Sequence, residues 1–193
     1  MEMNSVLKFF VNGPVWSFLL KYYFLLSLRK LLPKEPTQRR VLEIGCGAGV
    51  STIIFKKWFP NAFITAIDYD ETEIKMAKIR LKNLKNIIVL RADATALPFS
   101  AGSFDLVIET NTFHHIKNWQ TAISEAARVL APGGTFLVMD EAKTFIGFPL
   151  IRFLDRPEAL FTVEEYTNTL QSVNMEVGEI RGKGIFYLRS KKL

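Results

Sequence analysis

The sequence predicts an α/β fold in which short strands form a mostly parallel β-sheet with helices between them. Three observations support this fold class. Short apolar runs alternate along the chain with segments of helical periodicity. The first run, Val41–Ile44, passes through a glycine-rich turn directly into a helix expected over residues 50–58. The chain of 193 residues is 49% hydrophobic, which is enough to build one sizeable core.

The remaining elements continue the same alternation. We expect strands over residues 63–68, 87–91, 104–109 and 135–139, and a helix over residues 71–84. Thr162-Val-Glu-Glu165 has the form of a capping box, which predicts a helix that runs to about Ser172. The chain then returns to strand character over residues 175–181 and 184–189, and these two strands are expected to pair as a hairpin.

The glycine-rich turn has a spacing that separates two classes of nucleotide site. Glycine lets the backbone turn tightly and approach a ligand closely. Dinucleotide-binding enzymes use G-x-G-x-x-G, but this chain has Val50 where the last of those glycines would be. It also carries an acid, Glu43, inside the strand before Gly45. The resulting E-x-G-x-G-x-G pattern resembles motif I of the class I S-adenosylmethionine-dependent methyltransferases.

Other motifs extend the resemblance over residues 39–140. The second strand ends in Asp68, Asp93-Ala94 follows the third strand, and the fourth runs into Thr110-Asn-Thr-Phe-His-His115. Arg128-Val-Leu-Ala-Pro-Gly-Gly134 then leads into the fifth strand. The chain is most similar to the type 11 small-molecule and quinone methyltransferases. That resemblance implies a Rossmann-like three-layer sandwich with a seven-stranded, mostly parallel sheet and an antiparallel last strand.

The resemblance also implies S-adenosylmethionine as the cofactor, S-adenosylhomocysteine as the product, and a set of binding residues. Asp68 would accept hydrogen bonds from both ribose hydroxyls. Asp93, with Ala94 beside it, would accept from the adenine amino group. The backbone platform under the ribose and the methionine portion would be formed by Gly45, Cys46, Gly47 and Gly49.

Three more residues have an implied role beside a purely structural one. Glu43 would hold the glycine turn and, through water, the amino end of the cofactor, or it is a structural acid. Tyr69 would lie along the adenine face, or it is an ordinary surface tyrosine. Asn111 would approach the methionine end, or it caps the following helix.

The chain has two histidines, His114 and His115, and both are candidate catalytic residues. One of them could take a proton from the acceptor as a general base, or the pair could simply fix the turn. Methyl transfer from a sulfonium depends mainly on alignment, so we expect no metal ion. Strand-end carboxylates for a metal-assisted reaction are present, but they also suit ordinary hydrogen bonding; they are Glu109, Asp140 and Glu141.

The amino-terminal part of the chain differs from the rest. We expect residues 1–36 to form an apolar helical cap segment and residues 37–193 to form the cofactor-binding domain. Gly13-Pro14 interrupts the apolar run, which makes it too short for a membrane span. The segment would form a lid over the cofactor, or residues 5–32 would make peripheral contact with an anionic membrane. Seven basic residues against two acidic ones give residues 1–40 a net charge of +5.

These features together predict methyl transfer to a small acceptor that is apolar and quinone-like or lipid-like. The single cysteine, Cys46, is typical of a reducing interior, so we expect the protein in the cytoplasm or on the inner face of the membrane. No nucleic-acid partner is expected, because residues beyond 40 are nearly neutral. The alternatives are a cofactor-binding partner or scaffold protein without transfer activity and a nicotinamide-dependent oxidoreductase. The oligomeric state is not predicted.

Overall fold

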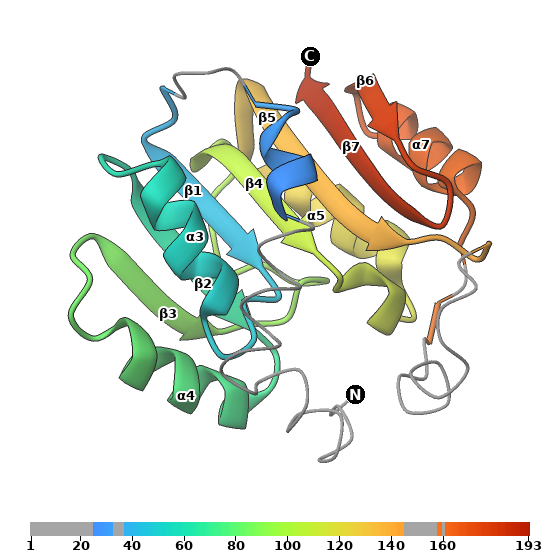
Figure 1. The fold of residues 1–193 in the computed structure, drawn as a ribbon. Coiled ribbons are helices and arrows are strands. Elements are labelled where there is room, and N and C mark those ends of the chain that lie inside the picture. Colours follow the sequence, from blue (N-terminus) through green and yellow to red (C-terminus); the bar gives the residue numbers. More distant parts are fainter. Residues whose placement is uncertain (1–24, 33–36, 145–157, 160) are drawn as a thin grey trace.

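In a computed structural model the chain forms an α/β sandwich around a seven-stranded sheet (Figure 1). The structure describes residues 25–32, 37–144, 158–159 and 161–193. The strands are β1 (Arg40–Ile44), β2 (Phe63–Asp68), β3 (Ile87–Arg91), β4 (Phe104–Thr110), β5 (Leu130–Glu141), β6 (Met175–Arg181) and β7 (Ile185–Lys192). The helices are α3 (Val50–Trp58), α4 (Glu71–Leu81), α5 (Trp119–Val129) and α7 (Val163–Ser172), with the 3-10 helix η1 (Phe113–His115) between β4 and α5.

The strands are arranged in the order β3-β2-β1-β4-β5-β7-β6. β1 pairs in parallel with β2 and β4, so that Leu42 lies beside Thr65 and Val107. β7 is antiparallel to both of its neighbours, β5 and β6. The predicted fold class is therefore confirmed. The chain moves outward from β1 first toward β3 and then, from β4 on, in the opposite direction toward β5. The strand order thus reverses between β1 and β4, and ligands of such sheets bind at this point, beyond the carboxyl ends of the strands.

Helices cover both faces of the sheet (Figure 1). Alternate residues of each strand point to opposite faces, and in β4 Val107 belongs to one core cluster while Leu106 and Ile108 belong to another. The cluster with Val107 packs against α5 and α7 through buried aromatic rings such as those of Trp119 and Tyr166. The predicted capping box at the start of α7 is confirmed, since Thr162 and Glu165 exchange hydrogen bonds there.

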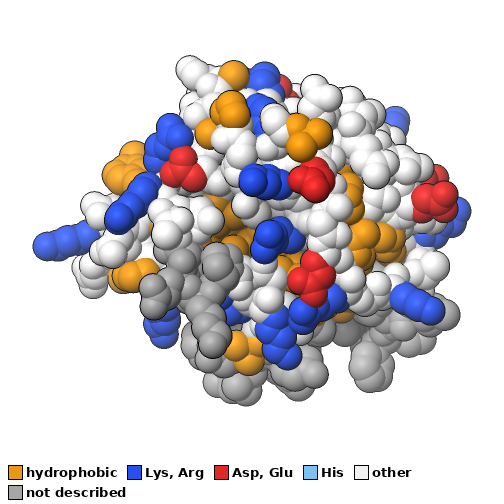
Figure 2. Space-filling view, turned by 90° about the horizontal axis from the view of Figure 1, so that it is seen from above, with side chains coloured by type: hydrophobic (Ala, Val, Ile, Leu, Met, Phe, Trp, Pro, Cys, Tyr) orange, Lys and Arg blue, Asp and Glu red, His pale blue; other side chains and the backbone are white. Residues whose placement is uncertain are grey.

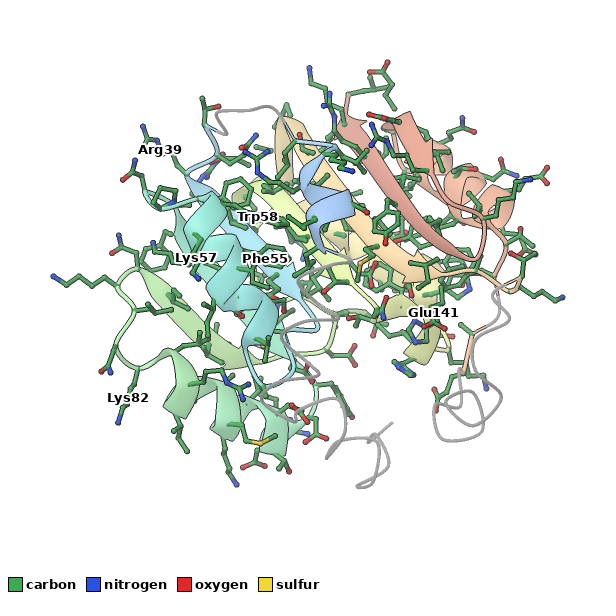
Figure 3. The ribbon with its side chains drawn as sticks, viewed as in Figure 1. Arg39, Phe55, Lys57, Trp58, Lys82 and Glu141 are labelled. Carbon is green, nitrogen blue, oxygen red and sulfur yellow. The ribbon has the colours of Figure 1, made fainter. Side chains whose placement is uncertain are left out.

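The described end of the amino-terminal segment is part of the core. Residues 25–29 are helical, and Leu25, Leu28 and Leu31 are almost fully buried in the same cluster as Phe55. Phe55 and Trp58 lie on the side of α3 that faces this helix, whereas Lys57 lies on the other side (Figure 3). The guanidinium of Arg189 in β7 donates to the carbonyl oxygen of Leu31 at 3.1 Å. These leucines therefore pack on the sheet and are not presented to a bilayer.

The other expectations for this segment concern residues that the structure does not describe. The lid over the cofactor and the membrane contact through residues 5–24 fall outside the described ranges, and the boundary at residues 36 and 37 stays a prediction. None of the helices in the described part of the chain is long and apolar enough to span a membrane.

A pair of alanine substitutions in one helix tests whether this segment packs on the sheet in solution. Leu28 is 0% exposed and Leu26 is 40% exposed. Leu28→Ala should lower the free energy of unfolding by about 2–5 kcal/mol, because it leaves a cavity against the sheet. Leu26→Ala should cost less than about 0.5 kcal/mol. Urea unfolding followed by circular dichroism measures both, and equally small losses would show that the segment does not belong to the core.

Candidate cofactor-binding site

The glycine turn at the end of β1 is fastened to the end of β2. The N–H groups of Gly45 and Cys46 both donate to the carbonyl oxygen of Ile67 at 2.9 Å. The N–H of Gly47 donates to Oδ2 of Asp68 at 2.8 Å. Cys46 itself is fully buried, and its thiol donates to the carbonyl oxygen of Gly47 at 3.5 Å within the turn. The structure thus brings the glycines and Asp68 together, as the resemblance implied.

Two glycines of the turn have different reasons to lack a side chain. A Cβ on Gly45 would lie 1.9 Å from Oγ1 of Thr112, so glycine lets the loop after β4 close against the turn. Gly47 has a φ of 51°, but the nearest side-chain or backbone atom to its added Cβ is Oε2 of Glu73 at 3.6 Å. Space therefore remains over Gly47 for a ligand, and not over Gly45. Gly49, at the start of α3, packs against Leu81 of α4.

Asp68 is placed to receive hydroxyl groups beside the turn. Its Oδ1 accepts the N–H of Asp70 at 2.9 Å, and its Oδ2 accepts that of Gly47. Burial raises the pKa of Asp68 above its ordinary value of 3.8, although these backbone hydrogen bonds act in the opposite direction. Each carboxylate oxygen has two lone pairs, so the side chain keeps acceptor capacity for ribose hydroxyls.

Glu43 ties β1 to the first turn of α3. It is 0% exposed, and its Oε1 accepts from the hydroxyl of Ser51 at 2.5 Å. α3 begins after Gly49, and within the described residues no side chain caps its first turn. An uncapped helix start above the sheet edge presents N–H groups to a ligand with acceptor oxygens. Of the two roles expected for Glu43, the structure shows the structural one, in its hydrogen bond with Ser51.

The residues expected at the adenine lie at the ends of β2 and β3. Tyr69 is 55% exposed, and the guanidinium of Arg91 lies 5.5 Å from the centre of its ring. Asp93 accepts from the N–H and hydroxyl of Thr95 through Oδ1, at 2.8 and 2.7 Å. Among the described residues nothing hydrogen-bonds to its Oδ2, which stays available for an amino group. Ala94, the next residue, is buried.

The loop after β4 carries the remaining candidates. Asn111 has a φ of 52°, which is a left-handed conformation that asparagine tolerates, and its N–H donates to the carbonyl oxygen of Met139 at 2.7 Å. His114 is 3% exposed, and its Nδ1 is hydrogen-bonded to Oδ1 of Asp140. His115 is partly exposed, and its ring centre lies 4.0 Å from that of His114. Contact between Thr112 and Gly45 keeps this loop beside the glycine turn.

Two residues that build this loop were not recognised from the sequence as its support. Glu109 accepts the N–H of Thr112 at 2.7 Å, and Asp140 accepts that of Phe113 at 3.0 Å. Burial and, second, the charge of Asp140 raise the pKa of Glu109 well above 4.5. Both acids were expected either to bind a metal ion or to make strand-end hydrogen bonds, and the structure shows the hydrogen bonds. Among the described residues no group of three or more His, Cys, Asp and Glu could hold a metal ion.

The fold and the site together define a class of protein. The strand order, the open space over Gly47, the uncapped start of α3 and the acid at the end of β2 fit a nucleoside-containing cofactor bound beyond the strand ends. This is the arrangement of a Rossmann-like, S-adenosylmethionine-dependent methyltransferase.

Comparison with known proteins gives the family. The model of a methyltransferase domain matches residues 42–138, which is just over half of the chain. The chain therefore belongs to the type 11 family of class I S-adenosylmethionine-dependent methyltransferases, and S-adenosylmethionine is its cofactor. This membership confirms the resemblance and sets aside the nicotinamide-dependent alternative.

Individual relatives agree with the family. The chain is 36% identical over 97 residues to a malonyl-[acyl-carrier protein] O-methyltransferase of Geobacter sulfurreducens, which covers 50% of this chain and 36% of that protein. It is 32% identical over 111 residues to a demethylmenaquinone methyltransferase of Thermus thermophilus, which covers 56% and 50%. The chain thus spans half or less of these relatives' length. A solved S-adenosylmethionine-dependent methyltransferase from Aquifex aeolicus has the same fold, with a TM-score of 0.73, 21% identity and coverage of 90% and 93%.

Alanine at Gly47 should weaken cofactor binding, and alanine at Gly133 provides a matched control. Both glycines have positive φ and open space, since the nearest atom to a Cβ on Gly133 is Cε of Lys191 at 3.8 Å. Each substitution should therefore cost about 1 kcal/mol of stability from backbone strain. Only Gly47→Ala should also reduce the affinity for S-adenosylhomocysteine, by at least about tenfold, because its methyl group enters the ligand space. Calorimetry on both variants measures this difference, and equal affinities would contradict the placement of the site.

Proposed function

We propose that this chain transfers a methyl group from S-adenosylmethionine to a small apolar acceptor. The observation that carries the proposal is the meeting of three strand ends. The turn after β1 is bonded to Asp68 at the end of β2, and its Gly45 is in contact with Thr112 after β4. A cofactor over Gly47 would lie between the acid and the loop that carries both histidines.

The residues of this chain would hold and orient the reactants. Asp68 accepts the ribose hydroxyls, Oδ2 of Asp93 accepts the adenine amino group, and the exposed ring of Tyr69 lies along the adenine face. The backbone of Gly45, Cys46, Gly47 and Gly49 supports the ribose and methionine portion, with Asn111 at the methionine end. S-adenosylmethionine supplies an electrophilic methyl group on a sulfonium. Positioning of this kind can account for most of the acceleration of a displacement.

Of the two candidate bases, His115 is better placed to meet an acceptor. His114 is almost fully buried and bonded to Asp140, whereas His115 is partly exposed beside it. We propose that His115 receives the acceptor's proton where the acceptor has one to lose, and that His114 supports its ring. No metal ion is assigned a role.

The acceptor class is proposed from the relatives together with the composition of the chain. The names of the two relatives given above refer to a malonyl-acyl carrier protein and a demethylmenaquinone. The demethylmenaquinone fits the expectation of a quinone-like acceptor, whereas the malonyl group is a polar acyl group carried by a protein. The apolar cap expected over the acceptor consists of the amino-terminal segment and residues 143–160. Of these, residues 1–24, 33–36, 145–157 and 160 lie outside the described ranges.

Cofactor binding and methyl transfer can be tested one after the other. Calorimetry should show binding of S-adenosylhomocysteine and no binding of NADH, and Asp68→Asn should weaken the former at least about tenfold, because an amide offers one acceptor oxygen instead of two. Incubation with methyl-labelled S-adenosylmethionine and a cell extract should then label the lipid-soluble fraction. Once the acceptor is known, His115→Gln should lower turnover at least about tenfold.

Three results would count against the proposal. Binding of NADH without S-adenosylhomocysteine would remove the cofactor assignment. Binding without any label transfer would favour the non-catalytic binding partner. Label in a water-soluble fraction would contradict the apolar acceptor.

We also propose that the protein works in the cytoplasm and can contact the inner face of the membrane. Lys and Arg side chains gather at the end of the molecule where the parallel strands begin, with fewer acids among them (Figure 2). Three exposed basic residues lie near the first residues of the parallel strands. Arg39 precedes β1, Lys191 pairs with Thr135 of β5, and Lys30 is next to Leu31, which Arg189 of β7 contacts. Basic side chains near an anionic bilayer contribute about 1 kcal/mol each.

Liposome sedimentation tests the membrane contact. The protein should sediment with vesicles that contain phosphatidylserine or phosphatidylglycerol and stay in solution with purely zwitterionic vesicles. Replacement of Lys30, Arg39 and Lys191 by Gln should reduce the bound fraction, whereas Gln at the exposed Lys78, Lys82 and Lys85 should reduce it less. Protein that remains entirely in the supernatant with anionic vesicles would refute the contact.

A further inference from the structure

Two carboxyl groups lie side by side in the core at the ends of β4 and β5. Glu109 and Asp140 are both 0% exposed. β4 and β5 are paired with Glu109 beside Val138 and Thr110 beside Met139, so Asp140 follows directly on the neighbouring strand. Their charges interact closely enough that Asp140 raises the pKa of Glu109. A buried charge is costly unless hydrogen bonds compensate it. The hydrogen bonds of each acid therefore indicate whether that acid is suited to the charged form.

Asp140 uses both oxygens as acceptors. Its Oδ2 accepts the N–H groups of Phe113 at 3.0 Å and His114 at 3.3 Å, and its Oδ1 accepts that of Glu141 at 2.7 Å. The ring nitrogen Nδ1 of His114 also bonds to Oδ1. Glu141, at the carboxyl end of β5, marks the place of this cluster in the fold (Figure 3). A carboxyl group surrounded by donors on both oxygens is suited to the ionised form.

Glu109 is bonded through one oxygen. Its Oε1 accepts from Thr112 at 2.7 Å and from Phe113 at 3.4 Å, while its buried Oε2 has no hydrogen-bond partner among the described residues. The titratable groups that face it are Asp140 from β5, His114 from η1 and Tyr166 from α7, whose own pKa is raised by burial and then by the two acids. Two adjacent carboxyl groups in a dry environment resist double ionisation.

We propose that Asp140 is the charged positioning residue of this site, fixing His114 as the tautomer with its proton on Nδ1, and that Glu109 is kept as its neutral, protonated neighbour. The ionised Asp140 then holds both the backbone of η1 and the ring of His114, beside which the ring of His115 lies. Glu109 supports the same turn through shape and one acceptor oxygen. The link to turnover rests on the proposed methyl transfer, but the protonation states do not.

Spectroscopy of the wild-type chain tests the assignment without any acceptor. With two histidines in the sequence, nitrogen-15 labelling gives ring signals that His115→Asn assigns. The signals of His114 should show the Nδ1–H tautomer of a neutral ring or, if the ring is charged, protons on both nitrogens. A wild-type ring with its proton on Nε2 alone would overturn the proposal, whether or not any variant folds.

A matched pair of isosteric variants separates the two acids. Glu109→Gln imitates a protonated acid and should change the His114 signals and the turnover less than Asp140→Asn does. Asp140→Asn should redistribute the His114 tautomers and lower kcat at least about tenfold, with less than about threefold change in S-adenosylhomocysteine affinity. The opposite ranking, with Glu109→Gln the damaging change, would overturn the proposal.

Infrared and unfolding measurements give the protonation of Glu109 directly. At a pH just above the ordinary Glu range the wild-type chain should show a protonated carboxyl absorption that Glu109→Gln removes, and its absence would refute the assignment. An acid with a raised pKa keeps a proton in the folded state that the unfolded state releases, so wild-type stability should fall as pH rises above the ordinary Glu range. Glu109→Gln should abolish that part of the fall. An unchanged pH profile would contradict a neutral Glu109.

Discussion

The carbonyl oxygen of Ile67 is the acceptor on which the arrangement of the site depends. Both Gly45 and Cys46 donate their N–H groups to it, which turns the chain sharply at the end of β1 and fixes it to the end of β2. Buried backbone groups need partners, and here one carbonyl provides for two donors where the strand ladder ends. The same closure places the N–H of Gly47 against Asp68 and the Cα of Gly45 against Thr112. One hydrogen-bonded turn thus sets the spacing among β1, β2 and β4.

The other side of the site is built by acids in the core. η1 has three residues, and among the described residues no side chain hydroxyl or amide caps it. Its N–H groups are satisfied instead by Glu109 and Asp140, which reach it from the ends of two adjacent strands. The desolvation of these carboxyl groups is offset by those bonds and by the His114 contact. The hydrogen bonds from Thr112, Phe113 and His114 to these two buried acids therefore fix the position of the loop that carries the histidines.

We expect cofactor binding and acceptor choice to depend on different parts of this molecule. The strand ends and the glycine turn lie in residues 42–138, the region that the family model covers. The relatives that share this region carry names that refer to different acceptors. We expect acceptor selection from segments outside this region, namely the amino-terminal segment and residues 143–160.

The sequence by itself determined the succession of strands and helices along the chain, the glycine turn, Asp68 at the end of β2 and the capping box at Thr162. These features follow from local periodicity and short-range chemistry. Tertiary structure decided which groups meet across the chain. Thr112 reaches Gly45 only because β4 lies beside β1, and Asp140 reaches His114 only because β5 lies beside β4. Leu28 packs on the sheet for the same kind of reason, since an apolar helix is compatible with a lid, a bilayer or a core until a partner surface covers it. Contacts between residues far apart in sequence have no local pattern, so only the folded chain specifies them.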